Sequence, residues 1–88
     1  MKTAFAKQFD KDVNKINDAK FLDKIEESIL SVENVRTMHD IVNLKKLRGY
    51  KIFYRIKVGR YRIGVSIVGE LVTFDRCLPR KDFYKFYP

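Results

Sequence analysis

Three basic side chains, Arg55, Lys57 and Arg62, are predicted to lie together on one face of a β-hairpin. The dipeptide Gly59-Arg60 separates two runs of alternating apolar residues, and Gly in this place is typical of a two-residue type II′ turn. With this turn, Lys57 lies opposite Arg62 and Arg55 lies opposite Gly64. Like charges opposed across strands are destabilising. The cluster therefore indicates a site that needs positive charge, which is a site for an anion.

The C-terminal segment adds further cations and a set of aromatic rings. Arg80 precedes the aromatic stretch 83–88, and Tyr84 falls four residues later, so the two can share one face of a helical turn. Cations interleaved with aromatic residues are what stacking on unpaired bases requires. For Phe83 and Phe86 we expect a structural role instead, as anchors of a short C-terminal helix.

A second two-residue turn, Gly69-Glu70, extends the hairpin to a third strand. In this register the cross-strand partners are Asp75 with Gly64 and Cys77 with Arg62. Arg76 would then point toward the core. Either a β-bulge reorients Arg76 or this residue lies at the rim of the sheet. Cys77 is expected to be a small buried strand residue and not a reactive thiol.

The elements that must position these residues follow from the change of period along the chain. Residues 9–35 have apolar positions at helical spacing with a break at Asn17-Asp18, and Asp18 is a candidate cap for the second helix. From residue 50 the period is two. The predicted fold is α+β, with an N-terminal helical hairpin packed on one face of a small antiparallel sheet and a short C-terminal helix. Residues 3–8 form either a strand or the entry to the first helix.

Composition limits the class of protein. The chain of 88 residues is 45% hydrophobic and has a net charge of +8, so one folded domain over residues 1–88 with an anionic partner is expected. No apolar stretch has the length of a signal peptide or a membrane span, and a single cysteine fits a reducing compartment, so we expect a cytoplasmic protein. No His, Cys, Asp or Glu grouping has metal-ligand spacing, and His39 falls outside the candidate site, so neither a metal nor a cofactor is expected.

Three segments together resemble the RelE/ParE toxin superfamily. They are Leu-Lys-Lys-Leu-Arg-Gly at 44–49, Tyr-Arg-Ile-Lys-Val-Gly-Arg-Tyr-Arg-Ile at 54–63 and Arg-Lys-Asp-Phe-Tyr at 80–84. Each segment is short, but their order, the chain length and the charge agree with that superfamily from residue 9 to the end.

The resemblance implies the toxin of a type II toxin–antitoxin system, with a RelE-like fold and a cognate antitoxin. RelE-like members enter the ribosomal A site and cut messenger RNA without a metal, through attack of a ribose 2′-hydroxyl on the adjacent phosphate. Carried over to this chain, the catalytic residues are Arg55, Lys57, Arg62, Arg80 and Tyr84.

The chemistry suits these residue types. Arg62 and Arg80 could stabilise the negative charge of the transition state, and Lys57 could act as base if its cationic neighbours favour its neutral form. Tyr84 could stack on a base or orient the phosphate. Two positions depart from the family pattern: Pro79 stands where relatives often carry His before the C-terminal Arg, and Arg55 stands where the best-known nucleases carry Lys.

Three functions remain open at this point. The first is a ribosome-dependent mRNA endonuclease (mRNA interferase) whose partners are the ribosome, mRNA and an antitoxin with an acidic or amphipathic segment that folds on contact. The second is a ParE-like inhibitor of DNA gyrase that performs no chemistry, because one fold can serve both. The third is an inactive relative kept for antitoxin or operator binding. If the protein is a toxin, we expect it to contact DNA only through the antitoxin complex and to involve no membrane.

Overall fold

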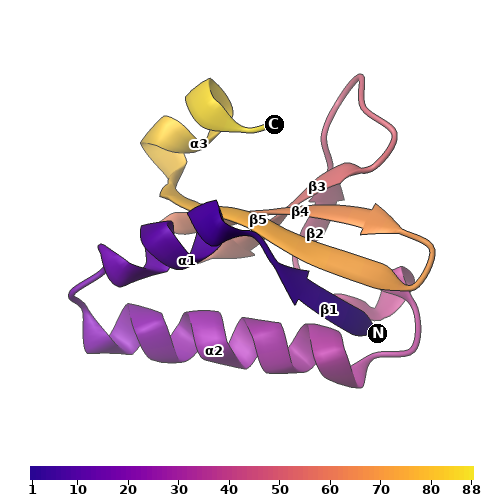
Figure 1. Ribbon diagram of the computed structural model, residues 1–88, viewed down its shortest axis with the longest axis horizontal. Coiled ribbons are helices and arrows are strands. Elements are labelled where there is room, and N and C mark those ends of the chain that lie inside the picture. The colour runs from indigo at the N-terminus through magenta and orange to yellow at the C-terminus, as the bar shows by residue number, and fades with distance from the viewer.

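A five-stranded mixed sheet forms the centre of the computed structural model, which describes all residues 1–88, and its strand order is β1-β5-β4-β3-β2 (Figure 1). The elements in chain order are β1 (Lys2–Phe5), α1 (Lys7–Asn14), α2 (Ala19–Asn34), the 3-10 helix η1 (Met38–Asp40), β2 (Leu44–Lys46), β3 (Phe53–Val58), β4 (Tyr61–Val68), β5 (Leu71–Pro79) and α3 (Arg80–Phe86). The α+β class, the N-terminal helices and the short C-terminal helix are as predicted.

The predicted hairpin between β3 and β4 is confirmed. Gly59 has a φ of 57° and Gly69, in the next turn, a φ of 58°. A positive φ at this position is what the tight two-residue hairpin turns require. The pairing places Lys57 opposite Arg62 and Arg55 opposite Gly64, in the register that the sequence predicts.

In the second hairpin, the pairing of β4 with β5 follows the prediction from the turn as far as Val65 and is shifted by one residue from Gly64 onward. A bulge between Gly64 and Val65 shifts the pairing, so that Gly64 faces Arg76 and not Asp75. Arg62 accordingly faces Leu78 and not Cys77. The bulge inserts one unpaired residue and breaks the alternation of β5, in which Phe74 and Cys77 are buried but Arg76 is not, so a strictly alternating register does not contain the shift. Both alternatives predicted for Arg76 are present. The bulge lies opposite this part of β5, and Arg76 is also at the rim of the sheet, because β1 pairs only with residues 71–74.

The N-terminal region resolves the question left open for residues 3–8. Residues 2–5 form β1, which pairs with β5 in parallel, and α1 follows from Lys7. The sheet is therefore mixed and not wholly antiparallel as predicted. The edge strand β2 was also not predicted, because three residues are too few to show a period. After a short break, α2 runs back antiparallel to α1 (Figure 1) and begins as predicted, with the Asp18 side chain accepting a hydrogen bond from Lys20 N at 2.9 Å.

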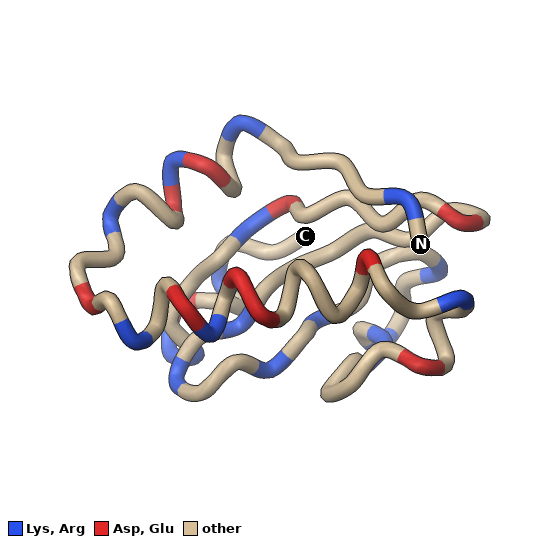
Figure 2. Tube along the Cα trace, turned by 90° about the horizontal axis from the view of Figure 1, so that it is seen from below, with Lys and Arg blue, Asp and Glu red and all other residues tan.

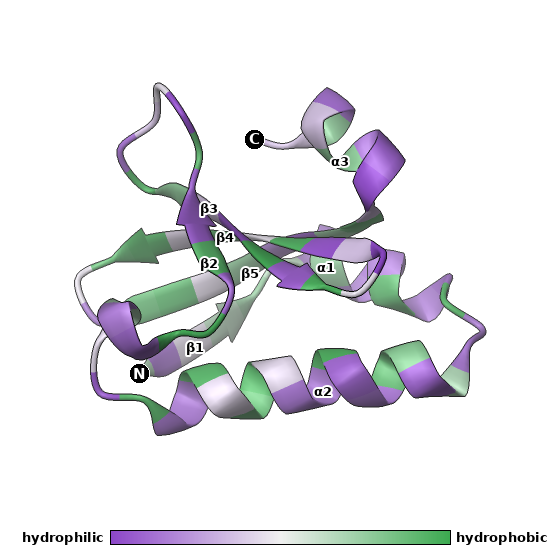
Figure 3. Ribbon diagram, turned by 180° about the vertical axis from the view of Figure 1, so that it is seen from behind, coloured by the Kyte–Doolittle hydropathy of each residue, from purple (hydrophilic) through white to green (hydrophobic).

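Two hydrophobic clusters hold the elements together, one on each face of the sheet. Thirteen buried residues, with Phe9, Ile25 and Val32 from the helices, form the main core under α2. In Figure 3 the central strands are largely hydrophobic, whereas α2 carries both kinds of residue, as a helix that covers a sheet should. No helix of the chain is both long and apolar enough to cross a lipid bilayer.

The second cluster lies under α3 on the opposite face, where Leu47, Phe83 and Tyr87 are buried. The anchoring role predicted for Phe83 is confirmed, because its side chain is fully buried. The same prediction for Phe86 is wrong, because that residue is 58% exposed. Positions 83 and 87 are four apart and share the face of α3 that meets the sheet, whereas position 86 falls beside that face.

Candidate functional site

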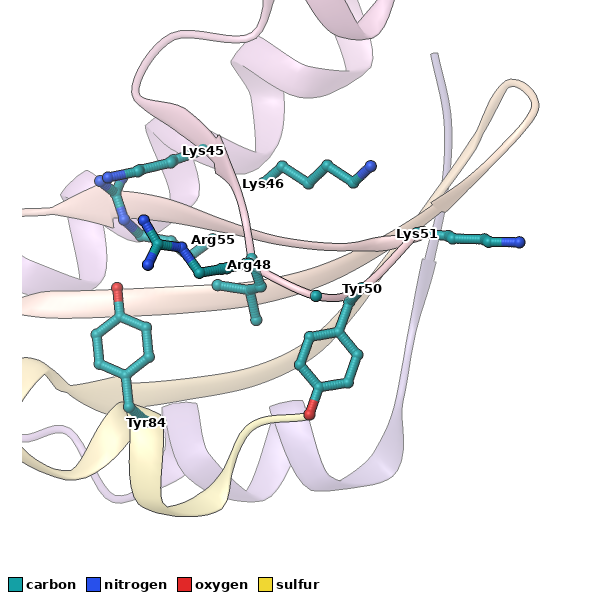
Figure 4. A pocket seen from close by; sticks show the side chains of 9 residues that line it. Lys45, Lys46, Arg48, Tyr50, Lys51, Arg55 and Tyr84 are labelled. Atoms are coloured by element: carbon teal, nitrogen blue, oxygen red, sulfur yellow. The ribbon is translucent and has the colours of Figure 1, made fainter.

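A cationic hollow of about 690 Å³ lies between α3 and the segment that joins β2 to β3 (Figure 4). The residues that line it are Lys45, Lys46, Leu47, Arg48, Gly49, Tyr50, Lys51, Arg55 and Tyr84. Five of these carry a positive charge and none carries a negative one. The hollow can therefore attract an anion with no acidic group to compete for its cations.

The charges of the chain are divided between its two halves. Residues 1–35 contain 6 Lys and Arg against 7 Asp and Glu, whereas residues 36–88 contain 13 against 4. Figure 2 shows the result, with red segments gathered mainly on the helices. The net charge of +8 is therefore concentrated on the half of the protein that builds β2 to β5 and α3.

Arg55 lines the hollow from β3 and is half-buried. Its Nη1 donates a hydrogen bond of 2.9 Å to the carbonyl oxygen of Asn43, a residue with a φ of 63° just before β2. This contact holds the guanidinium against the strand edge. Because no carboxylate accepts from it, the charge of Arg55 remains available to a ligand.

Arg62 is the most constrained cation of the site. Only 7% of the residue is exposed, and its Nη1 donates to the carbonyl oxygens of Gly59 and Tyr61 at 2.9 and 3.0 Å. The one other buried charged residue, Asp12, has an ion-pair partner, whereas Arg62 has none. Burial lowers the pKa of Arg62 from its ordinary value, and the nearby charges of Arg55 and Arg80 lower it further. A buried guanidinium among other cations is costly unless an anion binds there.

The other predicted site residues lie at different distances from this point. Of these, Arg55 and Tyr84 line the hollow, whereas Arg80, at the start of α3, borders a separate pocket with Arg60 and Lys81 and acts on Arg62 only by lowering its pKa. Lys57 is paired opposite Arg62, but it is exposed and borders a second groove between β3 and α2. The role of Lys57 as base stays a prediction.

The short helix α3 is positioned by contacts on both of its sides. The backbone N–H of Arg80 donates to the carbonyl oxygen of Arg60 at 2.8 Å. At the other end, the buried Tyr87 donates through its hydroxyl to Asp75 at 2.6 Å. Burial raises the pKa of the Tyr87 hydroxyl above its ordinary value, and the Asp75 carboxylate raises it further. Tyr87 therefore stays a neutral donor that ties the end of α3 to β5.

Several residues of the hollow were not among the predicted site residues. Lys45, Lys46, Arg48, Tyr50 and Lys51 contribute most of its lining. The segment 44–49 served in the sequence only as a family motif. The signal that could have identified it is the presence of four cations within seven residues, 45–51, without an acidic residue among them.

Two further residues lie outside the site, as expected. Cys77 is 2% exposed within the main core, and burial, together with the charge of Asp12, raises the pKa of its thiol to about 12. A thiol in this state is inert. His39 is exposed in η1 and lines no part of the hollow.

Comparison with known proteins assigns the family. A model of the family described as the ParE toxin of the type II toxin-antitoxin system, parDE, matches residues 4–84. Toxin RelE3 from Methanocaldococcus jannaschii is 37% identical over 89 residues, across all of both chains.

Solved structures agree with this assignment. The toxin in the RelB-RelE antitoxin-toxin complex from Methanococcus jannaschii superposes with a TM-score of 0.80 at 35% identity, over 97% of this chain and 99% of the other. The YoeB dimer from Staphylococcus aureus has a TM-score of 0.71 at 20% identity, over 89% of this chain and 94% of the other, which shows a shared fold. Because family model and full-length relative agree, the chain belongs to the RelE/ParE superfamily of toxins of type II toxin–antitoxin systems.

Proposed function

We propose that this toxin is a metal-independent, ribosome-dependent mRNA endonuclease. The observation that carries the proposal is the state of Arg62, which is buried, has no acidic partner and lies within reach of the charges of Arg55 and Arg80. A toxin that only blocked a protein surface would not need an unpaired buried guanidinium. A site that stabilises a developing phosphorane charge needs one, because preorganised donors contribute most when water is excluded.

In the proposed reaction, the ribose 2′-hydroxyl attacks the adjacent phosphorus, and the bond from phosphorus to the 5′-oxygen of the next nucleotide breaks. That oxygen takes up a proton from solvent, so the products are a 2′,3′-cyclic phosphate and a 5′-hydroxyl. Arg62 and Arg80 stabilise the negative charge on the phosphoryl oxygens, and Arg55 holds the phosphate at the wall of the hollow. Lys57 is the candidate base for the hydroxyl proton. Tyr84 stacks on a base or orients the phosphate from the other side.

The proposed partners follow from the charge of the same surface. Two related toxins have been solved as RelB-RelE and RelE-RelB complexes. We expect a cognate antitoxin here as well, with an acidic or amphipathic segment that folds onto the cationic face. The ribosome and its message are the targets, which places the activity in the cytoplasm. DNA is reached only through the antitoxin complex.

The test is to express the chain from a tightly controlled promoter and to map RNA ends on translated messages. We expect cuts in phase with codons, and a loss of about 10²-fold or more in rate for Arg62→Ala and Arg80→Ala. Arg36→Ala is the matched control, because Arg36 is exposed and does not line the hollow. Wild-type cells with intact messages would refute the nuclease.

A second candidate is inhibition of DNA gyrase without any chemistry, and the description of the matching family as a ParE toxin favours it. In that case the same expression experiment would leave messages intact and produce an SOS response with gyrase-linked DNA breaks. The two functions therefore give opposite results in one culture.

A further inference from the structure

Two exposed tyrosines, Tyr50 and Tyr84, line the hollow from different elements (Figure 4). Tyr84 projects from α3 and is 62% exposed, whereas Tyr50 projects from the segment between β2 and β3 and is 46% exposed. Large apolar side chains at such exposure are informative when they share one concave site. Besides these two tyrosines, Leu47 and Gly49, the residues that line the hollow are all Lys or Arg.

Both rings are held by a continuous row of aromatic contacts. The Tyr50 ring meets Phe53 edge-to-face at 5.6 Å between centroids, and Phe53 meets Tyr87 at 5.7 Å. Tyr87 packs on Phe83 at 5.3 Å, and Phe83 meets Tyr84 edge-to-face at 5.0 Å. Edge-to-face packing fixes the orientation of a ring while its outer face stays uncovered. The second hydrophobic cluster thus supports two partly exposed rings that line the same hollow.

Neither exposed tyrosine uses its hydroxyl within the chain. Tyr54 and Tyr87 use their hydroxyls within the chain, on Met38 and Asp75, whereas Tyr50 and Tyr84 have no such partner. The part of Tyr50 that could contact a ligand by stacking is its ring. A flat, preorganised aromatic face at the rim of a cationic hollow is suited to stacking.

We propose that Tyr50 is a second base-stacking position for single-stranded RNA, separate from the position at Tyr84. Single-stranded RNA combines flat bases with phosphates, and the hollow combines rings with cations, because Lys45, Arg48 and Arg55 lie on its lining with the two tyrosines. An acidic peptide would match the cations but would leave the ring faces without a flat partner. This inference rests on the proposed action on RNA and adds a position that holds a base near the cut.

The test uses a short RNA with 2-aminopurine at one position and with 2′-deoxyriboses that prevent cleavage. Stacking on a tyrosine quenches 2-aminopurine fluorescence, so quenching and affinity are measured together. We expect Tyr50→Leu to weaken binding about tenfold and to remove quenching at one base position. Leucine keeps the apolar contact with Phe53 and lacks a ring, so the fold is preserved. Tyr50→Phe should bind as the wild type does.

Phe86→Ala is the matched control, because Phe86 is 58% exposed on α3 but does not line the hollow. Removal of Phe86 should change neither affinity nor quenching. Equal binding and quenching by Tyr50→Leu and wild type would overturn the proposal. A weaker interaction of Tyr50→Leu with an acidic antitoxin peptide, with RNA binding unchanged, would overturn it as well.

A parallel cleavage assay on translating ribosomes separates this inference from the proposed function. If the wild type leaves the message intact while quenching depends on Tyr50, the nuclease proposal fails and the stacking site stands. If wild type and Tyr50→Leu cut equally at the same positions, with unchanged quenching, the stacking site fails and the nuclease stands.

Discussion

At the scale of single residues, Gly64 determines how closely α3 approaches the sheet. An added Cβ at this position would lie 2.7 Å from the ring of Tyr87, which is closer than side chains tolerate. The φ of Gly64 is not positive, unlike that of the three other glycines, so no backbone strain opposes a side chain there. Glycine is needed at 64 because the ring of Tyr87 occupies the space of the missing side chain.

We predict that Gly64→Ala destabilises the protein by about 1 to 3 kcal/mol, because Tyr87 must move out of its packed position. Under the proposed function, RNA cleavage should also fall by a larger factor than stability alone explains, since Tyr84 moves with the same helix. Urea unfolding measures the first effect. In a Tyr87→Leu background the cost of Gly64→Ala should shrink, and an equal cost in both backgrounds would exclude the clash as its cause.

At the scale of elements, Asp12 connects α1 to the free edge of β5. Its buried carboxylate accepts a hydrogen bond from the backbone N–H of Cys77 at 2.9 Å and forms an ion pair with Arg76 at 2.8 Å. Burial by itself raises the pKa of Asp12, but the hydrogen bonds from Arg76, Cys77 and Gln8 outweigh it and leave the pKa below its ordinary value. The contact closes the rim just before the strand leads into α3.

A depressed carboxyl pKa in the folded state means that Asp12 stabilises the protein above its unfolded pKa of about 3.9. This contribution is lost as the pH falls through the lower pKa of the folded state. We predict that Asp12→Asn costs about 1 to 3 kcal/mol at pH 7 and less at about pH 3. Urea unfolding at both pH values measures the difference. Asp10→Asn, an exposed change on the same helix, is the control, and a cost for Asp12→Asn that did not depend on pH would contradict this account.

At the scale of the whole molecule, the separation of charge gives the toxin two different faces. The helical half is nearly neutral, and the half with the hollow carries the positive excess. Cations that contact nucleic-acid phosphates release bound counterions, and the affinity then falls as salt rises. Long-range attraction by such a face also speeds the encounter with an anionic partner.

We predict that binding of uncleavable single-stranded RNA weakens with salt and that Arg48→Ala reduces the slope of log Kd against log salt by about 0.7. Arg36→Ala, which removes the same charge from an exposed residue that does not line the hollow, should leave the slope unchanged. Fluorescence anisotropy between about 50 and 200 mM KCl measures both. Equal slopes for Arg48→Ala and wild type would show that Arg48 contacts no phosphate.

Local patterns in the sequence were sufficient for several features of the site. The pairing of Lys57 with Arg62 follows from a two-residue turn and the alternation of a strand. The cap at Asp18 likewise depends on neighbouring residues alone. Both involve interactions over a few positions, where residue type and spacing decide the geometry. The family motifs are local in the same sense.

The meeting of residues from distant segments depends on the packing of the folded chain. The parallel pairing of β1, the bulge at Gly64 and the meeting of Tyr50 with Tyr84 around one hollow all join segments far apart in the chain. Their geometry depends on how side chains fill the two hydrophobic clusters, and close packing is a property of the whole set of residues. Residue types and spacing are therefore enough to predict a cationic sheet of the toxin superfamily, whereas the hollow between this sheet and α3 arises from packing.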